Sequence, residues 1–368
     1  MRKKILHIIT GLEVGGAETN LSRIIPCLEK SFENKICCLI GKGPMRKKFE
    51  EKNIPIYYLD IKNILDFFNP FIILKFRNIL KNFKPEIIET YLIHSDLFGR
   101  IWGRFFGVKK IVCNHRGSLL QWNWLAFFDK ITSFLVIKYV FQTPSAQKEI
   151  SEKLKIKIEK TFVIPNAIDL KNFEFEIDKS KKIKELNIKE NNINIVSVSH
   201  LRKGKGIKYL ISAFNDVFLK GYGNINLIIV GDGDQKPILK NQADISEARE
   251  NIYFLGKRND VLEILKISDI FVLPTFYEGM SNAILEAMAS KLAIITTAID
   301  VNKDLIKDNY SGLLVPIKDS QKISENLIKL IENSEERKRL GENAYNEIAK
   351  NYSIKNVSQK ITALLQTI

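Results

Sequence analysis

Two glutamates, Glu278 and Glu286, indicate chemistry most directly by their type and spacing. Glu278 follows the apolar run 269–273, which is typical of a buried parallel strand. Glu286 lies about a turn into a predicted helix that Ser281 would cap. Open α/β sheets bind ligands at the carboxyl ends of their strands, and a helix N-terminus there favours a diphosphate. We therefore expect the two carboxylates to accept hydrogen bonds from sugar hydroxyls. For either Glu alone, a turn or a solvated helix face is an equally good interpretation.

Three further predicted strand ends carry residues that suit a phosphorylated ligand. Gly15 and Gly16 follow the first predicted strand and open a helix, so the backbone can approach a phosphate there. His94 follows another strand, where a His is more often functional than inside a strand. Arg202 and Lys205 follow the first strand of the second half, where their charges could neutralise a diphosphate. Turn glycines and a solvated basic loop are the structural alternatives.

The segments that position these residues alternate throughout the chain between short apolar runs and amphipathic stretches. That alternation predicts doubly wound parallel sheets. The polar stretch 172–182 divides it into two series and is interpreted as an interdomain linker. The predicted strands are 5–9, 35–40, 87–91, 110–113, 139–142 and 161–164 in the first series, then 193–198, 225–230, 252–254, 270–273, 293–296 and 313–315 in the second.

The segment Pro274-Thr-Phe-Tyr-Glu278-Gly-Met-Ser-Asn-Ala-Ile-Leu-Glu286 resembles the donor-site signature of the retaining glycosyltransferases of family four, which have the GT-B fold. Gly-Gly-Ala-Glu at 15–18, Lys205-Gly206 and Pro165-Asn166 also match that family. The resemblance covers nearly the whole chain. It implies an α/β fold with two doubly wound Rossmann-like domains facing a cleft. The implied domains are 1–170 for the acceptor, 171–350 for the nucleotide sugar, and 351–368 as a helix packing back on the first domain.

The resemblance also implies roles for individual residues. Glu278 and His94 would act at the transferring sugar, and Lys205 would stabilise the leaving diphosphate. Arg202 would assist only if it substitutes for the family's Arg, whose place His200 takes here. Lys291 stands where the family generally has Gly. The donor-binding residues implied are Gly15, Gly16, Arg202, Lys205, Gly279, Met280, Ser281, Asn282 and Glu286.

Composition indicates a globular protein with an uneven charge. Residues 1–170 hold 28 Lys and Arg against 16 Asp and Glu, whereas residues 171–368 hold 29 against 26. The basic first half fits an anionic partner such as a membrane surface or a lipid diphosphate. Arg46-Lys47-Lys48 and Lys109-Lys110 are local basic clusters. Trp122, Trp124, Phe127, Phe128 and Phe134 form an aromatic-rich segment that could lie at a lipid interface or pack on the sheet.

Several other features restrict the function and the location. The four cysteines are interpreted as reduced, buried thiols of a cytoplasmic protein. The first apolar run is too short for a signal peptide, and no run is long enough to cross a membrane. Asp232-Gly233-Asp234 resembles the Asp-x-Asp of metal-dependent transferases. We interpret the two aspartates as turn residues and expect no metal or other cofactor, because basic residues would neutralise the diphosphate.

The resemblance, taken with these observations, implies a retaining, metal-independent glycosyltransferase. It would transfer a sugar from a UDP- or GDP-sugar to a hydroxyl acceptor. We expect the acceptor to be a lipid-linked saccharide in the assembly of cell-surface polysaccharide such as lipopolysaccharide or capsule. The protein would be cytoplasmic and peripheral on the inner face of the cytoplasmic membrane. One alternative is a sugar-nucleotide 2-epimerase of the same fold. The other is a basic nucleic-acid-binding protein, for which we find little aromatic interleaving; no nucleic-acid partner is expected.

Overall fold

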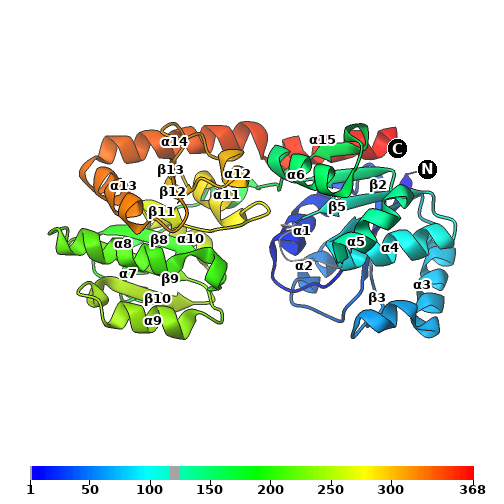
Figure 1. Cartoon of the computed structure of the whole chain (residues 1–368), viewed down its shortest axis with the longest axis horizontal. Coiled ribbons are helices and arrows are strands. Elements are labelled where there is room, and N and C mark those ends of the chain that lie inside the picture. The colour runs from blue at the N-terminus through cyan, green and yellow to red at the C-terminus, as the bar shows by residue number, and fades with distance from the viewer. Residues whose placement is uncertain (1, 117–124) are drawn as a thin grey trace. The chain divides into compact units, whose positions relative to one another are not determined.

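The computed structural model describes residues 2–116 and 125–368, which form two compact α/β units (Figure 1). Unit 1 comprises Met1–Ala167 together with Ile354–Ile368, and unit 2 comprises Ile168–Ser353. The chain therefore leaves unit 1 once and returns to it. Ile168 and Ser353, the first and last residues of unit 2, form an isolated parallel bridge to each other.

The sheet of unit 1 is parallel and has the strand order β3-β2-β1-β4-β5-β6-β7 in the described residues. The order reverses between β1 and β4, which pair with each other through Ile5–Ile87 to Ile9–Tyr91. The strands are β1 (Lys3–Ile9), β2 (Phe32–Cys38), β3 (Ile56–Tyr58), β4 (Ile87–Tyr91), β5 (Lys110–His115), β6 (Lys138–Phe141) and β7 (Thr161–Val163).

Helices cover both faces of this sheet because alternate strand residues point to opposite sides. Leu6 and Ile8 of β1 belong to the core that contains α3 and α4, whereas Ile5 packs with α1 and α15. α2 packs with α1 through Phe49. The helices are α1 (Gly16–Leu28), α2 (Arg46–Glu50), α3 (Pro70–Phe83), α4 (Ile93–Phe105), α5 (Leu125–Thr132), α6 (Pro144–Leu154) and α15 (Ile354–Thr367), with the 3-10 helix η1 (Ile64–Phe68).

The sheet of unit 2 is also parallel, with the order β10-β9-β8-β11-β12-β13 in the described residues. Its order reverses between β8 and β11. The strands are β8 (Ile193–Val198), β9 (Ile225–Val230), β10 (Ile252–Gly256), β11 (Ile270–Leu273), β12 (Ala293–Thr297) and β13 (Leu313–Val315). The helices are α7 (Lys179–Glu185), α8 (Ile207–Leu219), α9 (Lys236–Asp244), α10 (Val261–Lys266), α11 (Asn282–Ala289), α12 (Asp300–Lys303), α13 (Ser320–Glu332) and α14 (Ser334–Asn351).

Two expectations from the sequence are wrong, and one strand was missed. The stretch 172–182 is not a linker, because Phe173 is buried in the core of unit 2 and α7 begins at Lys179. β3 was not predicted, since its three residues are too few to show a period. Cys27 of α1 is exposed, whereas the other three thiols are buried.

Candidate functional site

Two loops of unit 2 meet where its strand order reverses, and they carry most of the predicted donor-site residues. One follows β8 and contains the 3-10 helix η6 (Lys203–Lys205); the other follows β11 and contains Glu278. β8 and β11 are neighbours in the sheet, so their carboxyl ends lie side by side. Such a switch point is where open α/β sheets bind their ligands.

Hydrogen bonds hold these two loops against each other. The Phe276 amide donates to the Gly204 carbonyl at 2.8 Å, and the Thr275 hydroxyl donates to the same oxygen at 3.3 Å. Gly206 has a φ of +67°, and a Cβ there would lie 2.0 Å from the Pro274 carbonyl oxygen. The close approach of the two loops therefore requires glycine at position 206.

The structure brings the predicted phosphate-binding cation and the predicted catalytic carboxylate into contact. The Lys205 ammonium donates to Glu278 Oε1, and the two side chains are only 19% and 15% exposed. The partly buried pair would be reorganised by a diphosphate, because an anionic ligand competes with Glu278 for the ammonium. Lys205 and Glu278 thus form one electrostatic unit rather than two independent sites.

The N-terminus of α11 adjoins this pair. The Ser281 hydroxyl accepts a hydrogen bond from the Ile284 amide at 3.3 Å, so Ser281 is the predicted N-cap. Met280 is buried, whereas Gly279, Asn282 and Glu286 are partly accessible. An eight-residue helix opening at this point contributes amide donors and a partial positive charge.

Arg202 lies differently from Lys205. Its side chain is exposed, and its amide donates to the His200 carbonyl at 2.8 Å within a tight turn. Burial, together with the charges of Arg202 and Lys205, lowers the pKa of His200 below its ordinary value. His200 stands where the resemblance places an Arg. Its imidazole is therefore neutral beside the basic loop.

Lys291 adopts a left-handed conformation, with φ at +59° after the end of α11. Glycine is favoured in that region, which gives a physical reason for the family's preference at this position. Although it is not a glycine, Lys291 adopts this left-handed conformation, and its ammonium forms an ion pair with Glu342 at 2.9 Å.

The Asp-x-Asp stretch is engaged by protein groups. Asp232 accepts from the Gly233 amide at 2.8 Å and pairs with Lys236 at 2.9 Å, and Asp234 accepts from Gln235 at 3.1 Å. The hydrogen bond from Lys236 lowers the pKa of Asp232. In the part of the chain that the structure describes, no three His, Cys, Asp or Glu side chains are grouped as metal ligands.

Unit 1 carries a second group of predicted residues at its own switch point. Gly15 is the N-cap of the 13-residue helix α1, and Gly16 is its first residue. Glu18, in the first turn, is buried, and burial raises its pKa. Arg116 follows β5 beside it and lies over the Tyr91 ring, with a hydrogen bond to Asn166 Oδ1 at 2.7 Å.

Arg116 was not singled out from the sequence, although it stands at a strand end. Because side chains alternate along a strand, His115 points into the core and Arg116 is the residue at the edge. The signal that could have identified Arg116 is its place directly after the last residue of β5, at the carboxyl edge of the sheet.

His94 begins α4 and lines a pocket at the same edge. The pocket holds about 210 Å³ and is mainly apolar. Burial lowers the pKa of the half-buried imidazole, so His94 is neutral near neutral pH. The preceding Leu92 has a φ of +73°, a strained conformation for a residue other than glycine. The pocket is lined by Thr10, Leu39, Ile40, Ile61, Lys62, Asn63, Ile64, Phe67 and His94.

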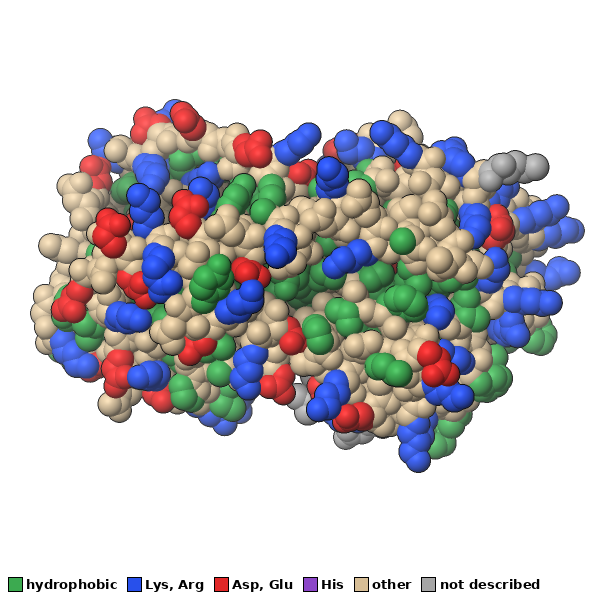
Figure 2. Space-filling view, turned by 90° about the horizontal axis from the view of Figure 1, so that it is seen from above, with side chains coloured by type: hydrophobic (Ala, Val, Ile, Leu, Met, Phe, Trp, Pro, Cys, Tyr) green, Lys and Arg blue, Asp and Glu red, His purple; other side chains and the backbone are tan. Residues whose placement is uncertain are grey.

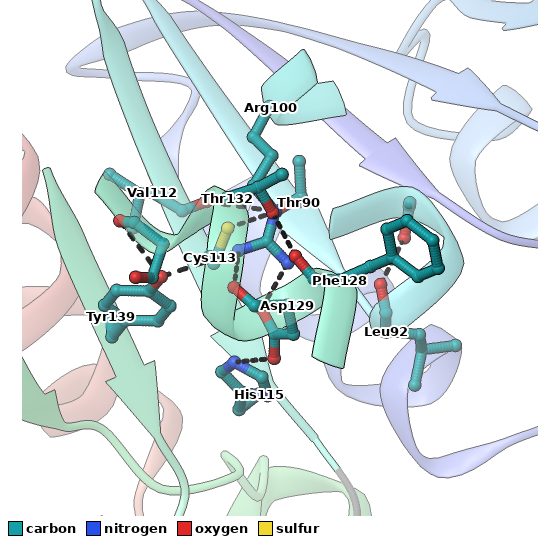
Figure 3. Close-up of polar contacts among 12 residues, drawn as sticks. Thr90, Leu92, Arg100, Val112, Cys113, His115, Phe128, Asp129, Thr132 and Tyr139 are labelled. Carbon is teal, nitrogen blue, oxygen red and sulfur yellow. Dashed lines mark hydrogen bonds and ion pairs between the residues drawn. The ribbon is translucent and has the colours of Figure 1, made fainter. Parts of the chain in front are cut away.

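A buried polar cluster joins α4 to α5 and β5 (Figure 3). Arg100 is fully buried and forms an ion pair with Asp129 of α5. His115 lies 3.4 Å from the other Asp129 oxygen, stacks on Phe141, and has its pKa lowered by burial. Asp96 is also buried, and burial is the main cause that raises its pKa. His115 therefore belongs to the polar cluster that joins α4 and α5, and it does not line the pocket of His94.

Two family models match the chain over most of its length. The model described as Glycosyltransferase Family 4 matches residues 14–172, and the one described as Glycosyl transferases group 1 matches residues 178–347. The fold and the matches define a class of enzymes, the glycosyltransferases of the GT-B fold. Within that class, this chain belongs to glycosyltransferase family four, as the sequence motifs predicted.

Curated relatives include transferases that act on lipid-linked saccharides. The UDP-Gal:alpha-D-GlcNAc-diphosphoundecaprenol alpha-1,3-galactosyltransferase of Escherichia coli is 30% identical over 78% of this chain and 76% of its own length. The N,N'-diacetylbacillosaminyl-diphospho-undecaprenol alpha-1,3-N-acetylgalactosaminyltransferase of Campylobacter jejuni is 28% identical, with 75% and 77% covered.

Solved structures share the fold across the whole chain. Anabaena HepE in complex with UDP has a TM-score of 0.88 at 19% identity, covering 99% of this chain and all of HepE. HepE in complex with UDP-glucose has a TM-score of 0.87 at 20% identity, with the same coverage. These likenesses confirm the predicted fold class.

Proposed function

We propose that the protein is a retaining glycosyltransferase that uses a UDP-sugar to extend a lipid-linked saccharide. The observation that carries the proposal is the contact between Lys205 and Glu278 at the switch point of unit 2, beside the N-terminus of α11. Cations and helix amides suit a diphosphate, and the carboxylate suits sugar hydroxyls. UDP is preferred to GDP because the structurally similar HepE was solved with UDP and with UDP-glucose.

In this proposal each donor-site residue has one task. Lys205, assisted by Arg202 and the amides near Gly279–Ser281, stabilises negative charge on the leaving diphosphate. Glu286 accepts hydrogen bonds from the ribose hydroxyls, and Met280 packs beside the nucleotide. Glu278 holds the transferring sugar. The acceptor oxygen attacks the anomeric carbon as the bond to the diphosphate breaks, on the same face, and the acceptor proton passes to a phosphate oxygen.

The acceptor side of the proposal rests on the relatives and on charge. Two relatives act on diphosphoundecaprenol-linked saccharides by name. An excess of 12 basic residues in 1–170 suits the diphosphate of such an acceptor and an anionic membrane surface. No helix in the described part of the chain is both long and apolar enough to cross a bilayer. We therefore propose peripheral attachment to the membrane that holds the acceptor.

A two-stage experiment tests this function. A thermal-shift screen of UDP-, GDP- and ADP-sugars first identifies the donor, since a ligand at 100 times its Kd stabilises the fold by about 2.7 kcal/mol. The responding sugar is then offered with a polyprenyl-diphosphate saccharide, and the product's anomeric configuration is read by NMR. A product with the donor's configuration supports the proposal. No shift with any donor together with no transfer would overturn it.

We also predict that transfer needs no divalent metal. Asp232 is already paired with Lys236, and cations other than a metal are available at the proposed diphosphate site. Turnover should be unchanged in excess EDTA. Loss of turnover that Mn²⁺ or Mg²⁺ restores would contradict this prediction and return attention to Asp232 and Asp234.

A further inference from the structure

α3 and α4 both pack on one face of the unit 1 sheet, and the end of α3, the segment 84–86 and the segment 106–110 that follows α4 line a groove rich in cations. The Phe76 and Phe98 rings pack edge to face between the two helices at 5.1 Å. The groove encloses about 660 Å³ near the C-termini of both helices. We call it the basic groove; its charged residues are Arg77, Lys81, Lys84, Lys109 and Lys110, with Glu86 as the one carboxylate that lines it.

The cations of the basic groove are available to a ligand. Arg77, Lys81, Lys84 and Lys109 are exposed and Lys110 is partly exposed. Among the ion pairs of the described residues, none involves these five side chains, whereas neighbouring Lys75 pairs with Asp60 at 3.0 Å. Cations near a helix C-terminus are favoured by the helix dipole, but that effect is confined to the last turn and does not account for Arg77, Lys109 or Lys110.

Bulky apolar side chains stand in solvent next to the basic groove. We call them the apolar rim, and they come from η1, α3 and the end of α4. Leu74, Arg77 and Lys81 follow one another at helical spacing, so the rim and the groove share a side of α3. The rim residues and their exposed fractions are Leu65 (77%), Phe68 (68%), Phe71 (82%), Leu74 (52%) and Phe105 (74%).

This combination is unusual for a surface that faces only water. Grouped exposed apolar side chains mark contact sites, whereas single ones need no explanation. Figure 2 shows Lys and Arg side chains gathered at the right-hand end of the view, which is unit 1, with hydrophobic side chains beside them.

We propose that the basic groove and the apolar rim dock unit 1 on an anionic lipid bilayer. The groove cations would contact lipid phosphates, while the rim phenylalanines enter the boundary between headgroups and acyl chains. A second copy of the chain fits less well, because a two-fold contact would oppose the five cations of one copy to those of the other. A nucleic acid would leave the aliphatic side chains of the rim without a partner.

The inference rests on the proposed function in one respect, the lipid-linked acceptor. η1 connects the two features: Ile64 and Phe67 line the pocket of His94, while Leu65 and Phe68 belong to the apolar rim. A bilayer held against the rim would lie beside that pocket. The acceptor's saccharide could then reach His94 while its lipid stays in the membrane.

Flotation with vesicles tests the surface without requiring activity. The full-length protein is mixed with phosphatidylcholine vesicles, with or without phosphatidylglycerol. We expect binding only to the anionic vesicles, and release at about 1 M salt, where the Debye length is about 3 Å. The variant Arg77→Gln/Lys81→Gln/Lys109→Gln should bind roughly 100-fold more weakly, on the scale of three surface cations. Phe71→Ser/Phe105→Ser should also weaken binding, but the salt dependence of the remaining binding should be unchanged.

Matched controls separate this surface from general charge and general apolarity. Arg46→Gln/Lys47→Gln/Lys48→Gln removes the same charge from α2, which packs on the opposite face of the sheet. Leu219→Ser/Ile245→Ser removes two exposed apolar side chains from unit 2. Both controls should bind anionic vesicles as the unaltered protein does. Circular dichroism confirms that each variant is folded.

Each outcome decides the inference. Equal losses in the α2 control, or no vesicle binding by the unaltered protein, would overturn it. Tighter binding to an RNA oligonucleotide at the same salt would assign the groove to nucleic acid, and a dimer dispersed by Phe71→Ser/Phe105→Ser would assign it to a second copy. Vesicle binding without sugar transfer would remove the proposed function and keep the surface. Transfer to a detergent-solubilised acceptor without vesicle binding would keep the proposed function and remove the docking surface.

Discussion

At the scale of residues, the pairing of Lys205 with Glu278 neutralises both charges of the proposed donor site's central ion pair before a ligand arrives. A diphosphate would draw the ammonium toward itself and leave the carboxylate to the sugar hydroxyls. Binding and orientation of the donor are then linked through one ion pair. Sequence spacing predicted both residues, but it could not predict their contact, because they lie 73 positions apart and meet only through the neighbouring strands β8 and β11.

Glu278→Ala should lower turnover by roughly two to three orders of magnitude, the scale of losing one preorganised polar contact. Glu286→Ala should mainly weaken nucleotide binding, since that carboxylate is proposed to hold the ribose. Steady-state kinetics with the donor varied would distinguish the two effects as kcat against KM. The assignment fails if both variants transfer sugar with unaltered kcat and KM.

Asp96 predicts a pH dependence of stability. Burial is the main cause that raises its pKa from 3.8 to about 8, with Arg100 acting in the opposite direction. Between about pH 4 and pH 8, the Asp96 carboxyl is therefore protonated in the folded state and ionised in the unfolded state. Across that window the free energy of unfolding should fall as the pH rises, by up to about 1.4 kcal/mol per pH unit from this group.

Asp96→Asn should remove this contribution. The variant should match the unaltered protein near pH 4 and unfold at a higher temperature at pH 8. Glu86→Gln, which alters an exposed carboxylate, serves as the control and should show no such trend. A constant difference in Tm between Asp96→Asn and the unaltered protein at every pH would refute the prediction.

At the scale of elements, loops rather than strands decide how the site is shaped. Apolar runs predicted β4, β8, β9, β11 and β13 at their observed bounds, because buried parallel strands show a strong local signal. The short β3 and the segment 172–182 were misjudged. A polar composition does not reveal that Phe173 will be buried by residues distant in sequence.

Gly206→Ala tests the contact between the two donor-site loops. The left-handed conformation and the 2.0 Å approach of the new Cβ to the Pro274 carbonyl oxygen should together cost about 2–4 kcal/mol. Donor affinity should fall as the loops separate. Gly221→Ala is the matched control, since its φ is +94° but no atom lies within 4 Å of the added Cβ. That control should cost only about 1–2 kcal/mol and leave donor affinity unchanged.

Equal stability and equal donor affinity in the two alanine variants would show that the Pro274 contact is unimportant. Chemical denaturation and donor titration by calorimetry give the two quantities separately. The comparison isolates the contact because both substitutions place alanine in a left-handed conformation.

At the scale of the whole molecule, unit 1 is assembled from both ends of the chain. α15 contributes Val357, Ile361, Leu364 and Leu365 to the core that also contains Ile5 and Ile24. The family resemblance implied this return of the last helix, which composition alone could not have shown. Burying such a side chain stabilises a fold by about 1.5–3 kcal/mol, so the final segment matters more than its length suggests.

Deletion of residues 354–368 should therefore destabilise unit 1 and spare unit 2. Unit 2 ends at Ser353 and keeps its own cores. Hydrogen exchange followed by mass spectrometry should show faster exchange in β1 and α1 and unaltered exchange in β8 and β11. Uniform protection in both units after the deletion would contradict this division.

The late arrival of α15 also matters while the protein is being made. Synthesis proceeds at about 5–20 residues per second, so translating Ile168–Ser353 takes roughly 10–40 s after the first part of unit 1 has left the ribosome. During that interval Ile5, Ile24, Leu28 and Phe32 lack the helix that will cover them. A nascent chain with this apolar face open is a natural client for chaperones. Unit 2 can complete its fold first, although it is encoded second.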